Sequence, residues 1–224
     1  MPNFFVVATP IGNLKDFSER AIITLRSVHT ILCEDTRVTK KLLDAYEIKT
    51  PVLSYHQHSD QAKTSQITKL IDAGHDLALV TDAGTPGISD PGGMLVEVLV
   101  KRYGSELKIV PIPGASAVIA ALSVSGFSAD EFVFLGFPPH KKGRQTFFDE
   151  LVHHKMTIVF YESTHRIFKT LDEIAKRFPD RALVVCRELT KLHEIIYRGT
   201  AREVTDALNT TSIKGEFVVV MKGK

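Results

Sequence analysis

The sequence predicts an α/β protein made of two α/β domains, residues 1–114 and residues 115–224, with a cleft between them. Short apolar runs alternate with amphipathic stretches along the whole chain, which is typical of strands that alternate with helices. Loops rich in glycine and proline separate the runs, and the alternation restarts after Gly126, which favours two units. Hydrophobic residues make up 44% of the 224 residues, enough for a core in each unit.

In the first half, each apolar run is short enough for a buried strand and is followed by a helical stretch with its own start signal. Ser18 can cap the first helix and Asp90 the fourth, with Pro91 at the first helical position, and Gly74 can end the third. This order of elements predicts a mainly parallel sheet. Strands are expected at residues 4–8, 30–33, 52–55, 77–80 and 107–110, and helices at 19–27, 36–46, 62–73, 91–104 and 117–125.

The second half repeats the alternation of strands and helices with shorter helical stretches. Ser163 can cap a helix that runs to Phe178, because a serine before an apolar-periodic stretch is a common helix start. Strands are expected at residues 132–137, 156–161, 182–187, 193–197 and 216–221, and the remaining helices at 145–153 and 202–208.

Composition limits the partners. The formal net charge is only +2, so contact with a nucleic acid requires a local basic patch. Cys33 and Cys186 lie far apart inside apolar runs, which indicates buried thiols in a reducing compartment. The start of the chain has no basic leader, and no apolar run approaches the ~18 residues of a membrane span. We therefore expect a soluble, cytoplasmic protein that does not contact membranes.

Residues 76–92 are the most informative stretch, because an apolar run empties into a loop that contains Gly84, Pro86 and Gly87 before the next helix begins. Such loops at the carboxyl ends of parallel strands bring backbone groups close to ligands. Three loops of this kind follow three strands, at residues 9–13, 81–89 and 111–116. None of the three matches the phosphate-loop pattern or the dinucleotide-binding pattern. The ligand that remains is a small cofactor with an adenine and a polar end.

Six segments together resemble a known family. They read VATPIGNL, CEDTR, TDAGTPGISDPG, PGASA, LGFPP and FYESTHR, at residues 7–14, 33–37, 81–92, 113–117, 135–139 and 160–166. The set is similar to the tetrapyrrole methylase superfamily, whose fold is that of the class III S-adenosylmethionine-dependent methyltransferases. The second and third segments resemble the branch that methylates the 2′-oxygen of a cytidine ribose in 16S ribosomal RNA of the small subunit.

The resemblance implies S-adenosyl-L-methionine as the cofactor, folded in the cleft between the domains. Thr85 departs from the cobalt-pathway relatives, which carry an acidic residue there, and this weakens a role in tetrapyrrole chemistry. The positions that match the family's cofactor contacts are Ile11, Ala83, Gly84, Thr85, Ile88, Ser116, Ala117, Tyr161 and Glu162.

Methyl transfer from a sulfonium is an in-line displacement, so a protein group must help to remove the proton of the acceptor hydroxyl. The catalytic candidates for this task are Asp35, Glu34 and Glu162. Each also has a structural interpretation: Asp35 can cap the helix that begins at Thr36, and Glu34 can pair with Arg37. The sequence alone does not assign the base.

A basic loop at residues 140–144 could bracket phosphates, although solvated loops often have the same composition. The predicted RNA-binding residues are Arg37, Lys141, Lys142, Arg144 and Arg166. No metal site is expected, because His56 and His58 lack a third ligand nearby.

Two alternatives remain open at this stage, a porphyrin or corrin C-methyltransferase and a non-catalytic module that binds S-adenosylmethionine or RNA. The resemblance also implies a homodimer. Members of the branch usually continue into a small helical segment after the last strand, whereas this chain stops at Lys224.

Overall fold

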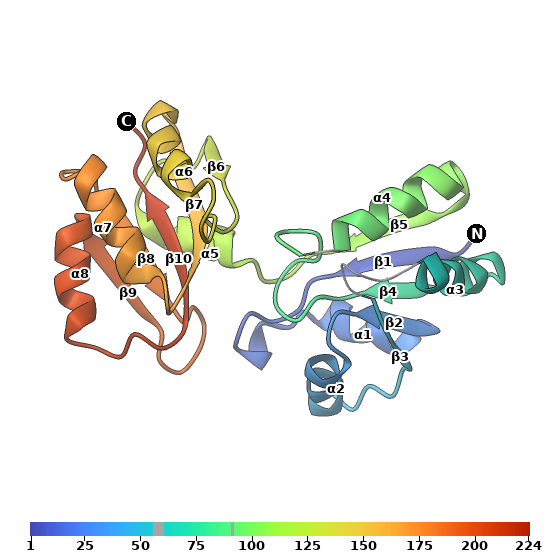
Figure 1. The fold of residues 1–224 in the computed structure, drawn as a ribbon. Coiled ribbons are helices and arrows are strands. Elements are labelled where there is room, and N and C mark those ends of the chain that lie inside the picture. The colour runs from blue at the N-terminus through green and yellow to red at the C-terminus, as the bar shows by residue number, and fades with distance from the viewer. Residues whose placement is uncertain (56–60, 91) are drawn as a thin grey trace. The chain divides into compact units, whose positions relative to one another are not determined.

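The computed structural model describes residues 1–55, 61–90 and 92–224 and divides the chain into two compact units, Met1–Ser116 and Ala117–Lys224 (Figure 1). The α/β fold class is confirmed, since each unit contains one five-stranded sheet with helices. The predicted division after residue 114, in the sense of two separately folding domains, stays a prediction, as does the cleft.

The first unit contains a sheet in which all five strands run parallel, as the sequence predicts. The strand order is β3-β2-β4-β1-β5, so β1 lies in the interior between β4 and β5. The strands are β1 (Asn3–Val7), β2 (Thr30–Cys33), β3 (Val52–Ser54), β4 (Leu77–Leu79) and β5 (Lys108–Ile112).

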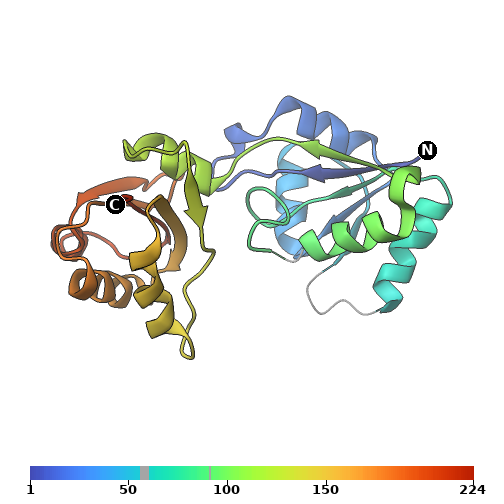
Figure 2. The same cartoon turned by 90° about the horizontal axis from the view of Figure 1, so that it is seen from above.

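Helices cover both faces of this sheet (Figures 1 and 2). One core packs Val7 of β1 against Ala21 and Leu25 of α1 and Leu43 of α2, and the other packs Phe4 of β1 against side chains of α3 and α4. Successive side chains along a strand point to opposite faces of the sheet, so β1 contributes to both cores. The helices are α1 (Glu19–Ser27), α2 (Thr36–Ala45), α3 (Gln61–Asp72) and α4 (Gly92–Tyr103), with short 3-10 turns η1 (Leu14–Asp16) and η2 (Gly104–Glu106).

Two adjacent strands, β1 and β4, lead into helices on opposite faces of the sheet, because α1 belongs to one core and α4 to the other. In an open α/β sheet, ligands bind at the carboxyl edge beside two adjacent strands whose connections lead to opposite faces. The topology itself thus selects the edge where the glycine and proline loops lie.

The second unit contains a mixed sheet with the strand order β6-β7-β10-β8-β9. Only β6 and β7 pair in parallel, and the other neighbours are antiparallel. The carboxyl ends of β6, β7 and β8 consequently share one edge with the start of β10. The strands are β6 (Phe132–Phe134), β7 (Thr157–Ser163), β8 (Leu183–Arg187), β9 (Ile195–Gly199) and β10 (Glu216–Met221).

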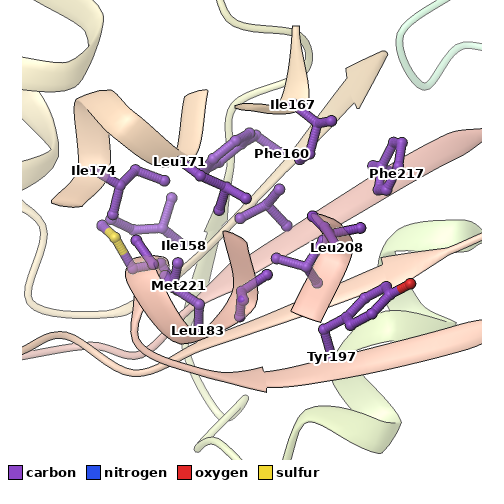
Figure 3. Packing of buried hydrophobic residues seen from close by; sticks show 14 of the residues in the cluster. Ile158, Phe160, Ile167, Leu171, Ile174, Leu183, Tyr197, Leu208, Phe217 and Met221 are labelled. Atoms are coloured by element: carbon purple, nitrogen blue, oxygen red, sulfur yellow. The ribbon is translucent and has the colours of Figure 1, made fainter. Parts of the chain in front are cut away.

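One core of the second unit fills the space between its sheet and four helical segments. Figure 3 shows Phe160 of β7 and Met221 of β10 among side chains of α7 and α8. The helix α5 packs against β7, β8 and β10. The helical segments are α5 (Ala117–Ser125), α6 (Arg144–Glu150), η3 (Leu151–His153), α7 (Ile167–Arg177) and α8 (Ala201–Asn209).

Two predicted caps are confirmed by hydrogen bonds. Ser18 Oγ accepts from the Ala21 N–H at 3.2 Å and Asp35 Oδ1 from the Arg37 N–H at 2.8 Å. Asp90 Oδ1 accepts from the N–H of Gly92, where α4 begins, at 2.6 Å. Pro91, which the sequence places at the first helical position, lies outside the described residues.

The predicted cap at Ser163 is wrong. Ser163 is the last residue of β7, and α7 begins only at Ile167. A turn separates strand from helix, since the Arg166 N–H donates to the Ser163 carbonyl at 3.0 Å. The Ser163 hydroxyl instead accepts from Arg166 Nε at 3.2 Å, so a side chain rather than the helix end uses its oxygen.

The strand predicted at residues 193–197 is displaced toward the C-terminus and spans Ile195–Gly199. Two successive backbone hydrogen bonds cause the displacement: the Lys191 N–H donates to the Glu188 carbonyl at 3.0 Å and the Glu194 N–H to the Lys191 carbonyl at 3.1 Å. The chain between β8 and β9 is therefore a tight turn where the sequence predicts the start of a strand.

Both cysteines are buried free thiols, as predicted, one in β2 and one in β8. Burial raises the pKa of Cys33, and it raises the pKa of Cys186 to about 11. None of the helices in the described part of the chain has the length and apolar character that a membrane span requires.

Candidate functional site

The loops that follow β1 and β4 are joined at the carboxyl edge of the first sheet. The Thr9 N–H donates to the Gly84 carbonyl at 2.9 Å, and the Gly84 N–H returns a bond to the Thr9 carbonyl at 3.2 Å. The Thr9 hydroxyl also donates to the Thr81 carbonyl at 3.1 Å. The predicted grouping of the strand-end loops is therefore present for this pair.

The loop that follows β5 joins the same group. The Thr85 hydroxyl donates to the Ala115 carbonyl at 3.2 Å, and a Cβ added at Gly114 would lie 3.0 Å from the Ala8 Cβ. Gly84 has a φ of +87°, a left-handed conformation that favours glycine. A Cβ there would lie 3.3 Å from Ile11 Cγ2, so Ile11, which is buried, fills the space beside the loop.

The outer surface of this edge carries small or apolar side chains. Ala83 and Ile88 are exposed, and Ser116 is half-buried. Ala117, also half-buried, is the first residue of α5 in the second unit. An edge made of small residues and backbone, with one exposed branched apolar side chain, suits a small ligand that has a flat apolar part and polar groups. The structure thus brings together the predicted cofactor residues of the first unit.

The loop after β2 also opens at this edge and places Asp35 beside Asp82. The Asp35 N–H donates to Asp82 Oδ1 at 3.3 Å. Asp82 is an exposed residue, but partial burial of its carboxyl group raises its pKa; the negative charge of Asp35 adds to the increase, while the hydrogen bond from the Asp35 N–H opposes it. Asp82 is therefore the carboxylate at this edge whose proton affinity is increased.

Asp35 itself has the opposite character. Hydrogen bonds from Arg37 lower the pKa of Asp35 to about 2, with Arg37 Nη2 at 2.7 Å from Asp35 Oδ2. A carboxylate with so low a pKa is a weak proton acceptor near neutral pH. The structure supports the cap interpretation of Asp35, and Arg37, which the sequence predicts to pair with Glu34, forms an ion pair with Asp35. Glu34 lies exposed beside Asp35.

Glu162 occupies a different environment, at the end of β7 in the second unit. Its side chain is fully buried and paired with two arginines, Arg166 Nε at 2.8 Å and Arg144 Nη2 at 3.6 Å. The Thr170 hydroxyl donates to Glu162 Oε2 at 2.5 Å, and the Ser163 N–H donates to Oε1 at 2.8 Å. Two ion pairs and two hydrogen bonds thus surround the carboxylate, so the geometry does not favour Glu162 as a general base or a ligand contact.

The same ion pairs disfavour RNA binding by Arg144 and Arg166, which stays a prediction. The side chain of Arg144 is 6% exposed and that of Arg166 is 13% exposed. Their guanidinium groups face Glu162 and backbone carbonyls of Pro138 and Pro139. Little guanidinium surface is left for a phosphate, because buried pairing to a carboxylate uses the donors that a phosphate would need.

Three of the predicted RNA contacts do lie at the surface. Lys141 and Lys142 are exposed in the loop between β6 and α6. Arg37 is also exposed, with 87% of its side chain accessible, although it pairs with Asp35.

Tyr161, a predicted cofactor contact at the end of β7, is half-buried. Its ring centroid lies 5.3 Å from that of Phe137, and burial raises the pKa of its hydroxyl group.

No group of histidine, cysteine or acidic side chains that could hold a metal ion occurs within the described ranges. His56 and His58, the pair considered from the sequence, lie outside these ranges.

Two candidate functional residues, one in each unit, were not singled out by the sequence. Asp82 stands in the glycine-rich loop, where its loop position attracts attention but its proximity to Asp35 does not follow from local pattern. Thr170 lies in the middle of α7, and its link to Glu162 depends on how that helix packs on β7. The only sequence signal available for Thr170 is a hydroxyl on the buried face of an amphipathic helix.

Comparison with known proteins gives consistent results. The sequence profile of the family described as Tetrapyrrole (Corrin/Porphyrin) Methylases matches residues 3–205. Ribosomal RNA small subunit methyltransferase I of Synechocystis sp. is 44% identical over 221 residues, which are 98% of this chain and 78% of that protein. The protein of the same name from Bacillus subtilis is 44% identical over 98% of this chain and 74% of its own length. The one from Thermotoga maritima is 42% identical over 100% of both chains.

Solved structures of similar fold are more distant in sequence. The cobalamin biosynthetic enzyme cobalt precorrin-4 methyltransferase has a TM-score of 0.70 at 19% identity and is matched over 98% of this chain and 94% of that one. Uroporphyrin-III-C-methyltransferase from Thermus thermophilus has a TM-score of 0.67 at 16% identity, again over 98% and 94%. At these identities the likeness shows the fold alone.

The conformation of Gly84 yields a first prediction. Gly84→Ala should lower the free energy of unfolding by about 1–2 kcal/mol, because an L side chain is unfavourable in the left-handed region. It should also weaken binding of S-adenosylmethionine, since the added Cβ crowds Ile11. Gly74→Ala is the matched control: its φ is +85° but its Cβ meets nothing within 4 Å. Urea denaturation and titration calorimetry measure both effects, and equal cofactor affinity in the two variants would contradict the assignment of this loop.

The burial of Glu162 yields a second prediction. Glu162→Ala should lower the free energy of unfolding by about 3–5 kcal/mol, because it leaves two buried guanidinium groups without their carboxylate. Asp172→Ala removes an exposed pair with Lys176 on α7 and should change stability little. Denaturant titration of both variants makes the comparison. Similar small effects would show that the buried pairs do not hold the second unit together.

Proposed function

The chain belongs to the tetrapyrrole methylase family, and from that premise we propose that it transfers a methyl group from S-adenosylmethionine to 16S ribosomal RNA, at the 2′-hydroxyl of a cytidine ribose. The observation that carries the proposal is identity of 42–44% over nearly the whole chain with proteins named ribosomal RNA small subunit methyltransferase I. The solved structures named for precorrin and uroporphyrin methylation are 16–19% identical, which supports the fold but not a tetrapyrrole substrate.

The first-unit edge fits the cofactor. Bound S-adenosylmethionine would supply a methyl group on a positively charged sulfur. The residues we assign to holding it are the small and apolar ones of the joined loops: Ile11, Ala83, Gly84, Thr85, Ile88 and Ser116. Ala117, the first residue of the second unit, stays a prediction from the resemblance. The Thr9–Gly84 and Thr85–Ala115 hydrogen bonds fix these loops before any ligand arrives, so little ordering is required on binding.

Asp82 is the residue that we assign to proton removal. A ribose hydroxyl is a weak acid, and a carboxylate with a raised pKa accepts a proton more readily than an ordinary one. Asp35 supports this role without performing it, because its N–H orients Asp82 and its charge raises the pKa of Asp82. Glu34 remains a second candidate for the base, as the sequence predicts.

The RNA is assigned to exposed cations. Lys141, Lys142 and Arg37 offer ammonium and guanidinium groups to phosphates, an interaction that weakens as salt is added. The cytoplasmic location and the homodimer stay predictions from the resemblance.

Two measurements test the proposal. Titration calorimetry with S-adenosylmethionine should give saturable binding, and absence of binding would contradict both the ribosomal RNA and the tetrapyrrole activities. Transfer of a labelled methyl group to small ribosomal subunits that lack the modification should exceed transfer to a tetrapyrrole. Label in the tetrapyrrole alone would establish the alternative enzyme, and binding without label in either would establish a non-catalytic module.

Asp82→Asn tests the proposed base. The methyl-transfer rate should fall about 10²-fold or more, the scale of general-base catalysis, because an amide cannot take the proton. In the unmodified enzyme the rate should rise with pH as Asp82 loses its proton, and the midpoint should lie above the usual aspartate range, since burial raises its pKa.

Asp44→Asn, at an exposed position of α2, is the control for Asp82→Asn and should keep both the rate and its dependence on pH. An Asp82→Asn variant with an unchanged rate would remove Asp82 from the mechanism and leave Glu34 as the candidate.

A further inference from the structure

The buried ion cluster of the second unit, made of Glu162, Arg144 and Arg166, invites a functional explanation. Two guanidinium groups share one carboxylate out of contact with water. Such clusters are expensive to desolvate, and apolar residues of similar volume often stabilise a fold at least as well. The cluster also leaves Arg144 Nε buried without a hydrogen-bond partner. A contribution to stability alone therefore does not explain this buried ion cluster well. The other hydrogen bonds of Arg144 and Arg166 indicate what else the cluster does.

Both arginines extend from Glu162 to the same short stretch of backbone. Arg166 Nη1 donates to the Pro138 carbonyl at 2.9 Å, and Arg144 Nη1 donates to the Pro139 carbonyl at 3.2 Å. Prolines have no N–H, so these two residues cannot continue the ladder between β6 and β7 as donors. The ladder's last bonds lie just before them, where the Tyr161 N–H donates to the Gly136 carbonyl at 2.8 Å. The arginines thus hold the backbone beyond the end of the sheet.

The backbone that they hold leads directly into the basic loop, residues 140–144. Its far end is fixed by Arg144 itself, which begins α6 and whose N–H donates to the Lys141 carbonyl at 3.2 Å. Between the two anchors the side chains of His140, Lys141 and Lys142 are exposed. A rigid base beneath exposed lysines reduces the ordering that phosphate binding would require.

Thr170 links the two halves of the cluster. Its hydroxyl accepts from Arg144 Nη2 at 2.6 Å and donates to Glu162 Oε2 at 2.5 Å. Since Thr170 belongs to α7, the loop is tied through Arg144 and this hydroxyl to a helix of the hydrophobic core. One carboxylate and one hydroxyl therefore fix where the basic loop stands on the unit.

We propose that Glu162 and Thr170 are positioning residues for RNA binding, acting through Arg144 and Arg166 on the backbone of the basic loop. The inference rests on the proposed function, since it takes RNA as the ligand of Lys141 and Lys142. It assigns to the buried cluster a role in substrate affinity that neither a general base nor a purely structural ion pair would have.

The test measures binding of a fluorescein-labelled single-stranded oligoribonucleotide to the full chain over a range of salt concentrations. Thr170→Val keeps the shape of the side chain and removes the hydroxyl, and it should raise the Kd for RNA about tenfold, the effect of losing a charged contact. The affinity for S-adenosylmethionine should stay unchanged. Thr170→Ser restores the hydroxyl and should restore RNA binding. Asp172→Asn, two residues away on the exposed face of α7, is the control and should bind RNA normally.

A thermodynamic cycle separates positioning from stability. Replacing Lys141 and Lys142 together by alanine should lower the slope of log Kd against log salt by about 1.4, or roughly 0.7 for each phosphate contact. In the Thr170→Val background the same lysine replacements should change affinity by less than about twofold, because the loop is already misplaced. Glu162→Gln, checked for folding by circular dichroism, should behave like Thr170→Val.

The outcomes are distinguishable. Full additivity of the lysine and Thr170→Val effects would overturn the positioning role while leaving RNA binding intact. Wild-type protein that binds no RNA, with lysine replacements of no effect, would instead refute the proposed function. Loss of S-adenosylmethionine affinity in Thr170→Val or Glu162→Gln would show that the cluster serves the cofactor and would also overturn the inference.

Discussion

The placement of β1 between β4 and β5, parallel to both, is the constraint on which the candidate site of the first unit depends. Parallel pairing brings the three carboxyl ends to one edge, and α1 and α4 lead away from that edge to opposite faces of the sheet. Thr9 and Gly84 then join the loops by backbone hydrogen bonds, which requires a left-handed residue at Gly84. The glycine at this position is thus explained by the order of the strands in the sheet and not by the loop alone.

Local pattern was enough to predict most of this unit. Alternating apolar runs located the strands, and the caps at Ser18 and Asp35 follow from short polar side chains before helical stretches. The grouping of the loops followed from the expectation of parallel strands. The helix start at Ser163 failed because the same sequence signal, a serine before an apolar-periodic stretch, is satisfied here by the side chain of Arg166. Propensity cannot tell which of two nearby donors reaches a hydroxyl.

Side-chain chemistry was less accessible to sequence reasoning. Glu162, Arg144 and Thr170 are 8 to 26 residues apart in the chain, and only the packing of α6 and α7 on β7 brings them together. A motif therefore marked Glu162 and the arginines as functional without revealing that they neutralise one another. Asp35 and Asp82 illustrate the same limit, since each lies in a recognisable loop, but Arg37 lowers the pKa of Asp35 whereas burial, with the charge of Asp35, raises the pKa of Asp82. The sequence shows which residues carry a charge, whereas the groups that surround each charge depend on the tertiary structure.

The two cysteines carry a consequence of another kind. The chain has two cysteines in all, and each unit contains one of them, buried in a strand of its sheet. With their thiols protonated and shielded at neutral pH, they react with alkylating reagents only when the surrounding sheet opens. Each unit therefore contains one thiol whose reaction rate depends on how often that unit opens. The rates at which Cys33 and Cys186 become modified report the local stability of the two halves separately, without any added label.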